Sequence, residues 1–186
     1  MPDRHLPFWN RTKYSFVNYS GIVQTGGTCV FASVAGAINY LCGRKIWDYK
    51  KLEIVQFAVG KAADFSVIDV AIYPVQSEIK AFQYTVAQPG FVNPLQINKL
   101  RDWIDRKAIV ILSVEEATKT DSNFTRTQNW HMFTVISRDS DRFQIWDTNN
   151  HKGYLTESEL TSGFEYLNRN WFLPHDNADC LVIEKV

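Results

Sequence analysis

The chain has 186 residues, of which 45% are hydrophobic and 22% are charged. This length and composition fit one folded domain with a buried core and exclude long disordered stretches. Twenty basic residues balance twenty acidic residues, so no net field favours nucleic acid or an anionic membrane surface as a partner. Six Trp, eight Tyr and twelve Phe indicate an aromatic core, an aromatic-lined groove, or both.

No apolar run approaches the roughly 20 residues that span a bilayer, and the N-terminus lacks the apolar segment of a signal peptide. We therefore expect no membrane span, and a location in the cytoplasm or secretion by a signal-peptide-independent route. The cysteines, Cys29, Cys42 and Cys180, include no CxxC pair, and the four histidines show no metal-ligand spacing. This pattern argues against a disulfide framework and a metal site, and we expect no cofactor.

The chain opens with 20 residues that are expected to form an extended lead-in, and Gly26-Gly27-Thr28 then breaks it. From Cys29 to Leu41 small and apolar residues are nearly continuous, which predicts a helix buried on most sides. Gly43 follows this helix as its expected C-cap.

Helical spacing continues over the next part of the chain. A second helix is predicted over 49–63, with four side chains at helical spacing: Leu52, Val55, Gln56 and Val59. The pattern over 67–82 is ambiguous, although helical spacing is possible there despite Pro74. A further helix is predicted over 95–106, with Leu95, Leu100, Trp103 and Ile104 inward.

The second half of the chain has the pattern of strands. The β-branched run over 108–114 predicts a buried central strand. A polar loop is expected over 115–129, and strands over 131–137 and 142–148 are expected to meet at a turn over 138–141.

Two shorter elements are expected near the C-terminus. Residues 154–160 indicate a strand end that runs into a capped helix, with Thr156 or Ser158 as the cap, and a last strand is possible over 180–185. Residues 1–186 are therefore predicted to form a single α+β domain. Its mainly helical half is expected over 21–107 and its mainly antiparallel sheet over 108–186.

Cys29 opens the first predicted helix. A thiol attacks a carbonyl carbon as its thiolate, which a helix N-terminus and a nearby imidazolium both stabilise. Gln24 lies five residues upstream, where its carboxamide N–H and the backbone N–H of Cys29 could form the two donors of an oxyanion hole. The alternative is a thiol that only packs in the core.

The sequence QTGGTCVFASVAGA over 24–37 resembles the nucleophile segment of papain-like cysteine peptidases. That family carries Gln, a Gly-rich turn and Gly-Ser-Cys, followed by Trp-Ala-Phe-Ser running into a small-residue helix. Gly27-Thr28-Cys29 and Ala32-Ser33 match this pattern. The resemblance implies a papain-like fold with the nucleophile Cys29 at a helix N-terminus, and it predicts a later His on a strand, with Asn or Asp on the next strand.

Trp130-His131 and the apolar residues after it resemble this His segment, and Asp147 lies sixteen residues further on, the spacing that the family uses. The helix and strand just before them resemble those of the bacterial subgroup related to double-glycine, bacteriocin-processing peptidases, in which the orienting residue is usually Asp. The resemblance leaves 44–94 unassigned. The absence of the family's usual second cysteine before the nucleophile fits a bacterial or phage origin.

Strand parity gives an independent argument for the His–Asp pair. If residues 139–141 form a three-residue loop, Arg138 faces Arg142 and His131 faces Asn149. His131 and Asp147 then share one face of the sheet. A two-residue loop would turn Asp147 away from His131. The apolar pattern favours the three-residue loop, and Asn149 could orient the imidazole instead of Asp147.

The residues therefore predict a cysteine hydrolase that cleaves a peptide or amide bond through a Cys29 thioester, with His131 as general base. Transglutaminase-, acyltransferase- or deamidase-type transfer at the same site is one alternative, and an inactive fold that acts as a binding module is another. Trp130 and Gly27 are assigned to substrate binding, although Trp130 and Trp146 could equally be core residues. The expected partner is a peptide or protein substrate, and the protein could act as an effector or toxin.

Overall fold

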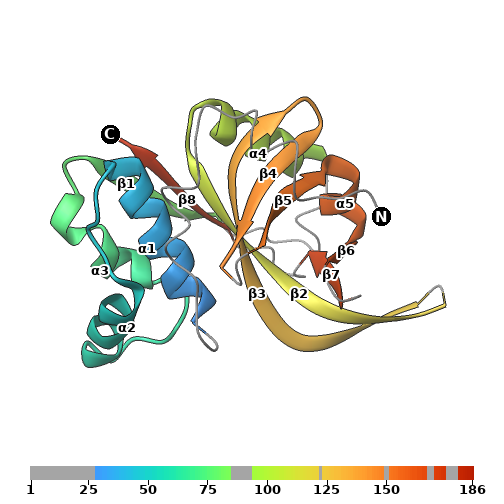
Figure 1. Cartoon of the computed structure of the whole chain (residues 1–186), viewed down its shortest axis with the longest axis horizontal. Helices are drawn as coiled ribbons and strands as arrows, with labels where there is room; N and C mark the ends of the chain where they lie inside the picture. The colour runs from blue at the N-terminus through green and yellow to red at the C-terminus, as the bar shows by residue number, and fades with distance from the viewer. Residues whose placement is uncertain (1–27, 85–93, 122, 149–150, 167–169, 175–179) are drawn as a thin grey trace.

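The structure, a computed structural model, describes residues 28–84, 94–121, 123–148, 151–166, 170–174 and 180–186 (Figure 1). Its helices are α1 (Cys29–Cys42), α2 (Tyr49–Ala58), α3 (Val67–Ala71), the short 3-10 helix η2 (Tyr73–Val75), α4 (Pro94–Asp105) and α5 (Glu157–Ser162). Its strands are β1 (Ile79–Tyr84), β2 (Ile109–Thr120), β3 (Asn123–Asp139), β4 (Arg142–Asp147), β5 (His151–Thr156), β6 (Phe164–Tyr166), β7 (Asn170–Pro174) and β8 (Cys180–Lys185).

The described strands form one antiparallel sheet in the order β1-β8-β2-β3-β4-β5. Strand β7 pairs with the outer part of β2 and also carries β6. Helices α1, α2 and α3 lie together beside the sheet, whereas α4 and α5 lie with the strands of the second half (Figure 1). The predicted α+β class is confirmed.

The central strand β2 explains why the molecule has two cores. Its successive side chains point to opposite faces of the sheet: Ile109 and Ile111 pack with α1 and α3, and Val110 and Leu112 pack with α4. The buried side chains on each face of the sheet form a continuous apolar cluster. The sheet therefore holds a helical layer on one face and α4 with the later strands on the other.

Helix α1 follows its prediction closely. Ten of its 14 residues are buried, as the continuous run of small and apolar residues requires, and small side chains allow neighbouring elements to approach. Gly43 ends the helix with a left-handed φ of 66°, and its N–H donates to the carbonyl of Tyr40. A residue with a Cβ adopts this conformation at a cost, so glycine is favoured there.

Helix α2 ends earlier than the predicted 63, because the chain turns back at Val59 and at Gly60, whose φ is 72°. Leu52 and Gln56 are buried as predicted, but Val55 and Val59 are exposed. The pattern alone overestimated the buried stripe because, among the described elements, α2 packs mainly against α1 and α3. The Gln56 amide donates to the Ala62 carbonyl and the Ser66 hydroxyl, which ties the end of the helix to the following loop.

Two further sequence predictions are corrected. The ambiguous segment 67–82 is helical only as far as Val75, and 79–84 forms strand β1, paired with β8 far along the chain. The expected polar loop over 115–129 is a β-hairpin arm, in which β2 and β3 pair as far as Thr120 and Asn123. Polar, exposed strands lack the apolar alternation by which a strand is predicted, and here backbone pairing supplies the order.

Candidate active site

Cys29 is the first residue of α1, at the end of the helix where the backbone N–H groups lack intrahelical partners. Its thiol is free and partly buried, and the first turn of α1 contains no acidic side chain. The positive end of the helix dipole therefore acts on the sulfur without a competing carboxylate from that turn.

His131 lies on β3, opposite Val114 of β2, and Asp147 is the last residue of β4. The Nε2 atom of His131 is 2.6 Å from Oδ1 of Asp147. Their side chains are only 12% and 4% exposed. Phe133 pairs directly with Asp147, so His131 and Asp147 are diagonal neighbours on one face of the sheet, as the strand parity predicts.

The turn between β3 and β4 differs from its prediction. The loop has two residues, Ser140 and Asp141, rather than three, and Asp139 pairs with Arg142. Such a loop alone would have turned Asp147 away from His131. A β-bulge at Ile136 adds one residue to β3 between the pairs at Val135 and Ser137 and restores the predicted register beyond it.

The Cys29 thiol also acts on the imidazole of His131 and helps to raise its pKa. Nε2 of His131 faces Asp147, so Nδ1 is the ring nitrogen available to Cys29. Burial of the imidazole lowers its pKa, but the hydrogen bonds to Asp147 and Cys29, together with the charges of both groups, outweigh burial and raise the pKa of His131 to about 9. The imidazolium, with both ring nitrogens as donors, is therefore the dominant form at neutral pH.

Aromatic side chains cover the imidazole. The rings of Phe133 and Phe172 have centroids 5.2 Å and 6.0 Å from that of His131, and Phe164 packs on both of these phenylalanines. An apolar cover reduces the local dielectric and strengthens the attraction between the imidazolium and Asp147. The sequence did not single out Phe172 or Phe164, and the richness in aromatic residues was the only signal of such a cover.

A buried carboxylate next to this site was also missed. Glu115 lies one residue beyond the partner of His131, and it accepts hydrogen bonds from the guanidinium of Arg126 (2.8 Å) and the backbone N–H of Gln128 (3.1 Å). Gln128 has a left-handed φ of 62° in an irregular stretch of β3. Glu115 thus fixes the backbone that leads into Trp130 and His131.

The other predicted site residues divide into three groups. Trp130 is 60% exposed beside the dyad, whereas Trp146 is buried in the helix-side core. Cys42 is partly buried and Cys180 is fully buried, in agreement with packing roles. The remaining predicted positions, Gln24, Gly27 and Asn149, lie outside the described residues.

The described residues contain no group of three or more His, Cys, Asp or Glu side chains that could hold a metal ion. None of the helices in the described ranges is long and apolar enough to cross a membrane. The site itself brings together a thiol, an imidazole and a carboxylate.

Comparison with solved structures identifies the fold. A crystal structure described as that of a "putative C39-like peptidase" from Bacillus anthracis is similar over 90% of this chain and 95% of its own, with a TM-score of 0.51 and 14% sequence identity. The chain has a C39-like peptidase fold. At this identity the likeness concerns the fold alone. No protein-family model matches the sequence, and no curated protein is similar to it.

Proposed function

We propose that the protein is a cysteine peptidase or amidase that cleaves its substrate through a Cys29 thioester. The observation that carries this proposal is the hydrogen bond between His131 and Asp147, together with the influence of Cys29 on the same imidazole, from residues of α1, β3 and β4. A nucleophile, a base and an orienting group in this order are what amide hydrolysis requires. Within the C39-like fold, we assign the protein to the bacterial double-glycine peptidase-like subgroup.

In the first half of the reaction, His131 holds the proton of the Cys29 thiol, and the sulfur attacks the carbonyl carbon of the scissile amide. The negative charge moves to the carbonyl oxygen, where the Cys29 backbone N–H and Gln24 are the proposed donors. When this intermediate collapses, the C–N bond breaks and His131 gives its proton to the leaving amine. A thioester on Cys29 remains.

In the second half, His131 removes a proton from water, and the resulting hydroxide attacks the thioester carbonyl carbon. The C–S bond then breaks and releases the acid product, which leaves the Cys29 thiolate and the protonated His131 with which the cycle began. Asp147 keeps the imidazole in the orientation that both halves need. Trp130, which precedes His131 on β3 and is exposed, is the proposed aromatic contact for the substrate, because a rigid aromatic ring offers apolar contact to a peptide.

Alkylation tests the nucleophile within one molecule. Iodoacetamide at about pH 6 should label Cys29 fastest, because a thiolate paired with an imidazolium reacts where ordinary thiols do not. Cys180 is buried, and burial together with the charge of Glu78 raises the pKa of the Cys42 thiol, so both serve as internal controls. Labelling of Cys29 should be far slower in the His131→Ala variant. Equal labelling of Cys29 and Cys42, unchanged in that variant, would contradict the proposal.

Incubation with a peptide library, followed by mass spectrometry, tests the reaction. Hydrolysis adds one water across each cleaved bond, so the masses of the two fragments exceed that of the intact peptide by one water. These fragments should be absent with the Cys29→Ser variant. Deamidation or cross-linking without any cut would indicate that the same thioester serves a different type of reaction. If no peptide changed mass although Cys29 showed rapid alkylation, peptide hydrolysis would be rejected for this library.

A further inference from the structure

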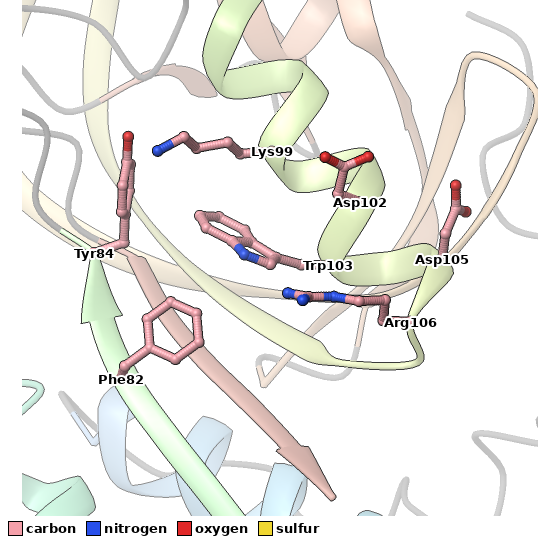
Figure 2. A pocket seen from close by; sticks show the side chains of 7 residues that line it. All are labelled: Phe82, Tyr84, Lys99, Asp102, Trp103, Asp105 and Arg106. Carbon is pink, nitrogen blue, oxygen red and sulfur yellow. The ribbon is translucent and has the colours of Figure 1, made fainter.

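A cleft of about 560 Å³ lies between β1 and α4, and none of its lining residues belongs to the candidate active site. Figure 2 shows its seven lining side chains. Two come from β1, four from α4 and one from the residue directly after α4: Phe82, Tyr84, Lys99, Asp102, Trp103, Asp105 and Arg106. The proposed hydrolysis does not use this cleft, so its role is a separate question.

Three aromatic rings form the inner part of the cleft. Trp103 is almost fully buried and meets the rings of Phe82 and Tyr84 edge-on, at centroid distances of 5.9 Å and 5.2 Å. Phe82, by contrast, is 40% exposed. The cleft therefore offers a fixed indole and an accessible phenyl ring, a combination that suits a bulky apolar group.

Two cations border this aromatic surface. Lys99 and Trp103 lie one turn apart on α4, and Arg106 directly follows the helix. Figure 2 shows the ammonium and guanidinium groups extending on either side of the indole toward β1. The Lys99 ammonium lies 4.4 Å from the centre of the Tyr84 ring. Neither cation forms an ion pair with any of the described residues.

The acidic groups of the cleft do not neutralise these cations. Both oxygens of Asp105 accept hydrogen bonds from Arg138, at 2.7 Å each, and Figure 2 shows Asp102 directed away from the aromatic rings. The nine residues between β1 and α4, 85–93, include no Asp or Glu in their sequence. A ligand with negative charge on an apolar body would complete this arrangement.

The position of strand β1 in the sheet indicates that the anionic ligand is a peptide. It is the last strand of the described sheet order, with β8 on one side only, and the edge of a sheet can pair with an added extended segment. Side chains of such a segment would alternate in direction, as those of β1 do, and every second one would reach the cleft. A nucleic acid would bring a charge at every nucleotide toward the rim that contains Asp102 and Asp105.

We propose that the cleft between β1 and α4 binds an extended acidic peptide segment of a partner protein. A bulky apolar side chain of that segment enters between Phe82 and Trp103, and flanking carboxylates face Lys99 and Arg106. Binding at this cleft requires no step of the proposed hydrolysis.

Fluorescence anisotropy of short fluorescein-labelled peptides tests the proposal. The set comprises an acidic peptide with a central Phe, the same peptide with a central Ala, and a version in which Lys replaces every acidic residue. The full chain with Cys29→Ala is used, so that turnover does not enter and the result is independent of the proposed peptidase. The acidic Phe peptide should bind saturably, roughly tenfold more tightly than the Ala version, and more weakly as salt rises.

Matched variants locate the binding. Arg106→Glu should weaken binding of the acidic Phe peptide by roughly tenfold, whereas Lys51→Glu, the same charge change at an exposed position of α2, should leave it within about twofold. Phe82→Ala should remove the preference for Phe over Ala in the peptide, and Tyr73→Ala, at another exposed aromatic residue, should keep it. Thermal unfolding checks that each variant is folded. If Phe82→Ala is unfolded, the Arg106→Glu variant, at an exposed position, is sufficient to test the proposal.

Three results would overturn the proposal. The first is equal weakening by Arg106→Glu and Lys51→Glu, which would indicate net charge only. The second is binding of the basic peptide, or of a single-stranded oligonucleotide, as tightly as the acidic Phe peptide. The third is the absence of saturable binding of the acidic Phe peptide.

Discussion

Two of the ion pairs of strand β3 lie on opposite sides of its bulge, and the comparison between them shows what burial changes. His131 and Asp147 are 12% and 4% exposed, whereas Arg138 and Asp105 are 27% and 52% exposed. Both pairs have good hydrogen-bond geometry. Water screens the more exposed pair, Arg138 and Asp105, which we call the outer pair. An aromatic cover keeps water from the buried pair, His131 and Asp147, which we call the inner pair. We therefore expect the inner pair to control reactivity and pH dependence, and the outer pair to have only small effects.

The largest expected difference concerns activity. His131→Ala should reduce kcat/KM by roughly a thousandfold or more, because the general base is lost. Arg138→Ala, on the same strand, should leave kcat/KM within about twofold. Steady-state kinetics on a peptide identified from the library measures both variants. A comparable loss in the two variants would mean that His131 acts through the stability of the strand rather than through chemistry.

The second largest expected effect concerns the pH dependence of stability and activity. The folded state raises the pKa of His131 from 6.5 to about 9, so the protonated imidazole stabilises the fold. This stabilisation is complete below about pH 6.5 and is lost as pH rises through about 9. The alkaline limb of kcat/KM should fall in the same range, because the imidazolium disappears there.

Asp147→Asn removes one of the groups that raise this pKa. Its alkaline limb, and the titration of His131 followed by NMR, should therefore move to lower pH, while Asp105→Asn should leave both in place. An unchanged His131 titration in Asp147→Asn would contradict the assignment of Asp147 as the partner that holds the proton on the ring.

The aromatic cover gives an intermediate effect. Phe172→Ala should lower the free energy of unfolding by about 2 kcal/mol, less than for a fully buried phenylalanine. Because burial is the largest influence on the imidazole and lowers its pKa, admitting water should also raise the pKa of His131. Phe57→Ala, at an exposed ring that packs edge-on against Phe31, is the matched control with no expected effect on His131. Denaturant unfolding and NMR titration provide the two measurements, and an unaltered His131 pKa in Phe172→Ala would refute the shielding role.

The smallest effect is expected at the outer pair. A double-mutant cycle of Arg138→Ala and Asp105→Ala should give a coupling energy of about 0–1 kcal/mol, decreasing with added salt. A coupling well above this range and insensitive to salt would show that exposure does not separate the two pairs. Thermal or denaturant unfolding of the four proteins measures it.

Some features of the site and the fold were predictable because their signals are local. The continuous small and apolar residues after Cys29 predict a buried helix, and Gly43 ends it within one turn. Thr156 caps α5 as one of the two predicted candidates, in a capping box with Glu159. The face shared by His131 and Asp147 also followed from strand parity, although the turn was predicted with the wrong length.

Other features required partners that are distant in sequence. Strand β1 has no clear pattern of its own, and its pairing with β8 decides its conformation. The hairpin arm over 115–129 is polar, so only pairing with β3 and β7 identifies it as strand. The cover from Phe172, the carboxylate of Glu115 and the cleft between β1 and α4 are likewise contacts between separate elements.

The sequence by itself therefore determined that Cys29 opens a buried helix and that His131 and Asp147 point to one side of a β-hairpin, because caps, periodicity and parity act over a few residues. Only the tertiary structure decided that Cys29, His131 and Asp147 act on one another and that the imidazole has a pKa of about 9. It did so because a bulge compensates a short turn, and because the resulting interactions with Asp147 and Cys29 outweigh the effect of burial on the imidazole.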